Sequence, residues 1–239
     1  MNHFKQATLF YKEHFKKILL VSLAVVFPIQ FIHFVLVNTI DNVYSAWLLP
    51  PFFSTLMTGF FALIAASMVQ LPFIKVVVDY EEEGAVNVRA ALGTTAYYLF
   101  CIYVMGILYA TGVVIGSLLF LIPGVLVFVF LYAFPYAAVM EDRKWFKGIK
   151  RAISFGKKHF FVLLAWLFIF LCIEFMIQFI ALFGLIQITT LAWPAMLLHM
   201  LLNMMFVPWF TFIISYYYLD WIGGLEERED WYINNYSIR

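Results

Sequence analysis

Several polar side chains interrupt long apolar stretches of this sequence, and they are the first candidates for chemistry. Glu174 and Gln178 are four residues apart, as are His199 and Asn203. On a helix this spacing projects both members of a pair from one face. With two residues of an earlier apolar stretch, the candidate ligand-binding set is Gln30, His33, Glu174, Gln178, His199 and Asn203.

Two uses of this polar set are open. Glu174 is its only formal charge, and ionisable groups at bilayer depth are costly and tend to be functional. One use is a binding or proton-linked site open to the outside, with Glu174 paired to His199 or His33. The other is helix association, in which interhelical hydrogen bonds contribute about 0.6 kcal/mol each. We favour helix association because nothing else in the sequence marks a pathway, and we expect Glu174 to lie against His199.

A second candidate is the basic segment, residues 141–159, which lies between two long apolar blocks and holds seven of the fifteen Lys and Arg residues. As a helix it carries an apolar stripe and a cationic stripe, the pattern of a helix lying flat on an anionic membrane surface. The expected headgroup contacts are Lys147, Lys150, Arg151, Lys157 and Lys158.

Composition places these residues in a membrane. The chain has 65% hydrophobic and only 12% charged residues, whereas soluble domains carry about 25% charged residues. Both cysteines, Cys101 and Cys172, fall inside apolar runs and are expected to be small hydrophobic residues without a disulfide.

Three charge-poor gaps each fit two membrane crossings of roughly 20 residues and a turn. We therefore predict an all-α polytopic membrane protein with six transmembrane helices in three hairpins, each hairpin preceded by a cytoplasmic interfacial helix. The helices are expected near residues 18–37, 52–76, 97–118, 123–140, 160–184 and 194–219.

The positions of the basic residues predict the orientation. The three turns inside the gaps contain no Lys or Arg, so the positive-inside rule puts both termini in the cytoplasm. A cleaved signal peptide over residues 1–45 is the rival interpretation. The apolar run there exceeds the 7–15 residues of a signal-peptide core, which argues against it.

Internal similarity suggests repeats within a single membrane domain, residues 1–239. Residues 5–20 and 150–165 share Lys, Ala, Phe and His at a constant offset. Repeats over 1–78, 79–142 and 143–222 would follow, leaving an acidic cytoplasmic tail at 223–239. Alternatively, any cytoplasmic helix entrance collects such residues, and for the middle copy this alternative is preferred.

Residues 120–165 contain five short motifs: Leu121-Ile122-Pro123-Gly124, Phe134-Pro135, Glu141-Asp142-Arg143, Gly148-Ile149-Lys150-Arg151-Ala152 and Gly156-Lys157-Lys158-His159-Phe160. With these motifs the segment resembles the middle of the bacterial six-helix membrane domain that precedes some glycerophosphodiester phosphodiesterases and also occurs in stand-alone relatives. The apolar stretch 127–131 departs from the family, which tends to carry a basic residue there. The resemblance implies the fold, a bacterial cytoplasmic membrane and lipid association, but not phosphodiesterase activity, because that domain is not present here.

No catalytic motif is found: the sequence has no zinc-binding His-Glu-x-x-His, phosphate loop or Gly-x-Ser-x-Gly turn. The carboxylates at 79–83 lack the ligand spacing of a calcium loop, so we expect no metal, no cofactor and no enzyme. Nucleic-acid binding is also not expected, because lipid headgroups explain the basic segment better.

Two function classes remain. The first is a non-catalytic scaffold or accessory subunit of an envelope or transport system, associated with anionic lipids or another membrane protein. The second is a small transporter or binding protein for an amphipathic solute, with a polar site around Glu174. A water-accessible cavity reaching Glu174 would favour transport, and mutually saturated polar groups would favour the scaffold.

Overall fold

The computed structural model describes residues 3–48, 50–186 and 193–236, without the side chains of residues 182, 185–186, 193 and 224–236. Every regular element in these ranges is a helix. Their bounds are α1 His3–Glu13, α2 Phe15–Val21, the π-helix η1 Ser22–Val26, α3 Phe27–Ala46, α4 Pro51–Val69, α5 Leu71–Glu83, α6 Val88–Leu119, α7 Leu121–Leu131, α8 Phe134–Met140, α9 Trp145–Lys158, α10 Phe160–Ile186 and α11 Trp193–Tyr236.

Within the described ranges, six helical segments are long and apolar enough to cross a membrane. They form three hairpins, which confirms the predicted all-α polytopic fold. The spans are Phe15–Ala46, Pro51–Glu83, Val88–Leu119, Leu121–Met140, Phe160–Ala181 and Pro194–Gly223. Each overlaps a predicted helix, although the first three run well beyond the predicted ends.

The prediction of an interfacial helix before every hairpin is wrong for the second hairpin. Separate helices, α1 and α9, precede the first and third. Before the third span there is only a short loop after Gly84, whose positive φ of 69° ends α5. The Asn87 side chain then accepts a hydrogen bond from the Ala90 N–H at 3.1 Å. This cap starts α6 at Val88, and no breaker separates its first turns from the apolar span.

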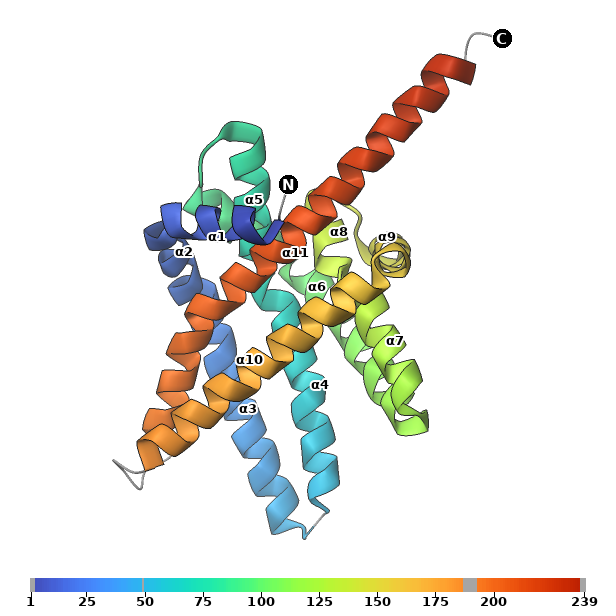
Figure 1. Cartoon of the computed structure of the whole chain (residues 1–239). Coiled ribbons are helices and arrows are strands. Elements are labelled where there is room, and N and C mark those ends of the chain that lie inside the picture. The colour runs from blue at the N-terminus through green and yellow to red at the C-terminus, as the bar shows by residue number, and fades with distance from the viewer. Residues whose placement is uncertain (1–2, 49, 187–192, 237–239) are drawn as a thin grey trace.

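The charged segments gather at one end of the molecule. Figure 1 shows α1, the C-terminal end of α5 and α9 at that end, and the α3–α4 and α6–α7 turns at the opposite end, where the hairpins diverge. We call the first end the charged end. α11 continues past it, away from the other helices. Apart from Gly223, the side chains of the predicted acidic tail, residues 223–239, lie outside the described residues.

The closely packed core lies toward the charged end and consists of two clusters. One contains residues from each of the seven helices α5, α6, α7, α8, α9, α10 and α11 and is centred on Tyr136, Phe155 and Tyr218. The other joins α1, α2 and η1 to α4, α5, α6 and α11 around Phe73 and Phe212. All five of these aromatic side chains are at most 2% exposed. Because lipid tails are as apolar as these side chains, close packing rather than water exclusion holds the spans together.

Small residues allow the closest helix approaches. A Cβ at Gly116 would lie 2.9 Å from the Gly124 backbone nitrogen, and one at Gly112 would lie 3.1 Å from Val127. This stripe on α6 therefore packs within the chain against α7, as its spacing suggests. On α9, a Cβ at Gly156 would lie 2.8 Å from the Phe130 Cα of α7.

The close approach of α9 to α7 predicts different stability effects for two matched alanine variants. Gly156→Ala should lower the free energy of unfolding by about 1–3 kcal/mol, because backbone atoms must move apart. Gly93→Ala, in α6, has nothing within 4 Å of the added Cβ and should be neutral or stabilising by up to roughly 1 kcal/mol. Unfolding midpoints in detergent measure both, and equal effects would contradict the packing described.

Candidate functional site

A tight connection between α8 and α9 positions the basic segment. Arg143 N–H donates to the Ala137 carbonyl at 3.1 Å, which folds the loop back on α8. Asp142 and Trp145 have positive φ angles of 47° and 56°, a conformation that is uncommon outside glycine. A Cβ at Gly148 would lie 2.3 Å from the Arg143 carbonyl oxygen, so the first turn of α9 packs on this loop only because residue 148 is glycine.

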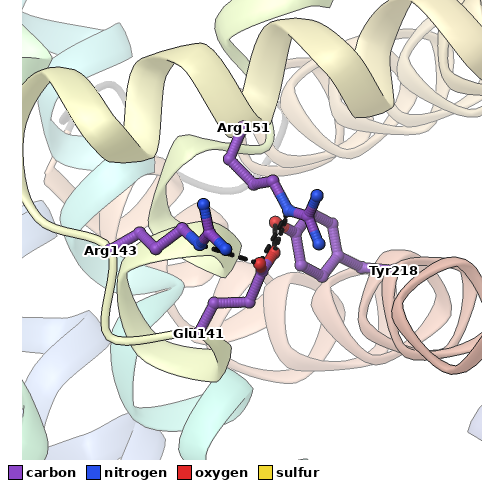
Figure 2. A network of polar contacts seen from close by, with 4 residues as sticks. All are labelled: Glu141, Arg143, Arg151 and Tyr218. Atoms are coloured by element: carbon purple, nitrogen blue, oxygen red, sulfur yellow. Dashed lines mark hydrogen bonds and ion pairs between the residues drawn. The ribbon is translucent and has the colours of Figure 1, made fainter. Parts of the chain in front are cut away.

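Glu141 is the centre of the ion-pair network at this connection (Figure 2). Arg151 Nε lies 2.8 Å from Glu141 Oε1 and 2.6 Å from Oε2. Arg143 Nε lies 3.2 Å from Oε2, and Tyr218 OH donates to Oε1 at 2.5 Å. The Glu141 side chain is only 9% exposed. One nearly buried carboxylate therefore joins the loop, α9 and α11.

Aromatic contacts support the same region. The Arg151 guanidinium carbon lies 4.4 Å from the ring centre of Trp221 on α11. The burial of Arg151 disfavours its charge, but the hydrogen bond and attraction of Glu141 outweigh this effect, so the pKa of Arg151 is raised. Tyr98 OH donates to Asp142 at 2.6 Å, and Lys144 Nζ lies 3.7 Å from the ring centre of Tyr97. Charged groups thus hold the loop before α9 to α6, and α9 itself to α11.

Beside this network lies an open pocket of about 430 Å³ whose lining includes four cationic side chains. The lining residues are Arg143, Lys147, Lys150, Arg151 and Ser154. The structure therefore brings together three of the five predicted headgroup residues. Lys157 and Lys158 are exposed and do not line the pocket.

Sequence reasoning missed Arg143 and Glu141. Their signal was two adjacent carboxylates, Glu141 and Asp142, followed by a further arginine at the start of a cation-rich segment, which could have suggested local neutralisation of a cation. Glu141 is not among the residues lining the pocket. It pairs with the two arginines and offsets one of the four positive charges, so the site keeps a net positive charge, to which an anion can bind.

The intramembrane polar set is only partly brought together. The expected contact between Glu174 and His199 is confirmed, with His199 Nε2 at 2.9 Å from Glu174 Oε1. The Asn203 side-chain N–H donates to the same oxygen at 2.8 Å. The other Glu174 oxygen, Oε2, and the Asn203 Oδ1 are buried without a hydrogen-bond partner. α10 and α11 are therefore joined by a polar cluster that is not fully saturated.

The remaining members of the set do not join this cluster. Gln178 is exposed and has no polar contact among the described residues. His33 lies near the backbone of Thr58 on α4. Its Nε2 and the side-chain oxygen of Gln30 have no hydrogen-bond partner. The predicted three-helix cluster is thus a two-helix cluster, because packing turns His33 toward its own hairpin partner.

No protein-family model, curated protein or solved structure matches this chain. The resemblance of residues 120–165 to the membrane domain found ahead of glycerophosphodiester phosphodiesterases therefore stays a prediction, as do the repeats.

The ion pairs of Glu141 predict a large effect of charge removal. Glu141→Gln should lower the free energy of unfolding by about 3 kcal/mol, because Arg151 would keep a partly buried charge without its partner. Glu82→Gln is the control, since Glu82 is exposed, and it should change stability by less than about 0.5 kcal/mol. Chemical denaturation in detergent measures both, and a Glu141→Gln effect as small as the control's would refute the structural role.

The polar cluster predicts a measurable coupling between two spans. In a double-mutant cycle, Glu174→Leu and Asn203→Leu should show a coupling of about 0.6 kcal/mol and at most about 1.7 kcal/mol. The cycle of Gln178→Leu with Asn203→Leu is the control and should show none, because Gln178 makes no contact with Asn203. Coupling energies that are the same in the two cycles would show that the contact contributes nothing to stability.

Proposed function

We propose that this protein is a non-catalytic, lipid-associated scaffold or accessory subunit of a bacterial cytoplasmic membrane. The observation that carries the proposal is the basic pocket at the charged end, in which four cations face outward from an ion-paired framework. Headgroups of anionic lipids supply phosphate at the depth where such a pocket meets the membrane surface.

The distribution of charge supports the cytoplasmic location of this pocket. The basic segments lie together at one end, and the described turns at the other end contain no Lys or Arg. The positive-inside rule assigns such an end to the cytoplasm, together with both termini. The cytoplasmic leaflet also carries the negative surface potential that attracts basic segments.

The state of Glu141 supports binding rather than catalysis. A general acid or base must be free to exchange a proton with a substrate. Glu141 instead accepts contacts from two arginines and a tyrosine and does not line the pocket. Its role is to fix cations in place. Exposed aromatic residues on α9 and α10, Phe146 and Phe161 at 71% and 81% exposure, offer apolar surface to acyl chains or to another membrane protein.

A specific observation also favours the second candidate function, a transporter or binding protein for an amphipathic solute. Glu174 Oε2 and Asn203 Oδ1 are two unpaired acceptors in adjacent spans, and an amine could donate to both. Dodecylamine would then raise the unfolding temperature of the unaltered protein but not that of Glu174→Leu. Equal shifts in both proteins would exclude this use.

Lipid retention by the purified full-length protein tests the main proposal. We expect native mass spectrometry to show more bound phosphatidylglycerol than phosphatidylcholine. Each lysine contributes about 1 kcal/mol, so Lys147→Gln combined with Lys150→Gln should weaken phosphatidylglycerol retention roughly thirtyfold.

The matched control is Lys157→Gln combined with Lys158→Gln, which removes the same charge from exposed positions of the same helix. It should leave retention nearly unchanged. Equal losses in the two double variants would mean diffuse surface attraction, and the absence of any preference for phosphatidylglycerol would mean that the pocket does not bind headgroups.

A further inference from the structure

The pocket offers more positive charge and more donors than a phosphodiester can use. Its wall combines two guanidinium groups, two ammonium groups and the Ser154 hydroxyl. The Glu141 carboxylate offsets one of these four positive charges and leaves three. A phosphodiester has one negative charge and two free oxygens. A terminal phosphate carries about −1.5 to −2 charges at pH 7 and three acceptor oxygens. The composition of the wall therefore matches a phosphomonoester better than a diester.

The two arginines are oriented before any ligand arrives. Both contact Glu141 through Nε, so the terminal Nη groups, which form the fork that pairs with phosphate oxygens, are not used in these contacts. Arg151 also stacks on Trp221, and Glu141 is fixed by Tyr218 on α11. A ligand would not have to pay the full entropic cost of ordering these arginines, which favours specific over diffuse binding.

The shape of the site also matters. Lys147, Lys150, Arg151 and Ser154 all come from α9, and Arg143 reaches the pocket from the loop before it. The pocket cations therefore come from two adjacent segments, and a terminal phosphate with three free oxygens can accept from both of them. A volume of about 430 Å³ leaves room for a glycerol or similar group attached to the phosphate.

From these observations we infer that the pocket selects headgroups that end in a phosphomonoester. This inference rests on the proposed function and narrows it. The same chemistry could come from a membrane lipid, such as phosphatidic acid, or from a soluble phosphomonoester, such as glycerol 3-phosphate.

The test compares binding of three probes to the purified full-length protein: short-chain phosphatidic acid, short-chain phosphatidylglycerol and glycerol 3-phosphate. Phosphatidic acid should bind at least about tenfold more tightly than phosphatidylglycerol, the equivalent of one charge-assisted hydrogen bond. Lys147→Gln should reduce this ratio, whereas Lys157→Gln should leave it unchanged. Both lysines are exposed, so neither variant should affect folding.

The pH dependence gives a second readout that needs no variant. A phosphomonoester gains its second negative charge near pH 6, so phosphatidic acid should bind more tightly as the pH rises from 5 to 7. Phosphatidylglycerol does not titrate in this range, so its affinity reports any pH-dependent change in the charge of Glu141, Tyr218 or the four cations themselves. The ratio of the two affinities should therefore rise with pH.

The possible results of the binding test distinguish a failure of phosphomonoester selection from a failure of the proposed headgroup binding. Equal affinities for the two lipids, both lost in Lys147→Gln, would overturn phosphomonoester selection and leave headgroup binding intact. No dependence on Lys147 for either lipid would overturn both. If glycerol 3-phosphate bound as tightly as phosphatidic acid and depended on Lys147, the phosphomonoester chemistry would be supported and its source would be soluble.

Discussion

The organisation of the charged end depends on the contacts of the Glu141 carboxylate. This nearly buried group forms ion pairs with Arg151 of α9 and Arg143 of the preceding loop, and it accepts a hydrogen bond from Tyr218 of α11. An ion pair with so little water around it is weakly screened, and removing one partner is costly. Because both arginines also line the pocket, the same contacts that hold α9 to the rest of the protein also fix the positions of two of the four pocket cations.

Because the lipid bilayer surrounds the spans, contacts other than apolar burial must supply the rest of the stability. Within lipid, burying an apolar side chain gains little, so spans associate through close packing and a few polar contacts. The closest approaches use glycine, at Gly116 against α7 and at Gly156 against Phe130. One cluster of packed aromatic rings, around Tyr136, Phe155 and Tyr218, lies next to the Glu141 network. At the far end the hairpins diverge and depend more on lipid.

Much of this fold was predictable from the sequence because the bilayer imposes strong rules. Long charge-poor stretches predicted the six spans, and the clustered lysines and arginines predicted a charged end. These two inferences required only composition and length, which do not depend on how each helix is rotated about its axis. The contact between Glu174 and His199 followed from the scarcity of polar partners in the spans.

The remaining features depend on rotation and packing. Gln178 shares a nominal face with Glu174, but four residues turn a helix by roughly 400°, and the residual offset is enough to leave Gln178 exposed. His33 contacts α4 instead of Glu174 for the same kind of reason. The pairing of Glu141 with Arg151 spans a loop with two positive φ angles, a conformation that residue types there do not predict.

The most direct test of this account is the sidedness of the pocket. On a background of Cys101→Ala and Cys172→Ala, Ser154→Cys marks the pocket and Leu48→Cys marks the α3–α4 turn. We expect a membrane-impermeant thiol reagent to label Ser154→Cys only in inside-out vesicles and Leu48→Cys only in right-side-out vesicles. Labelling of both positions from the same side would contradict the account.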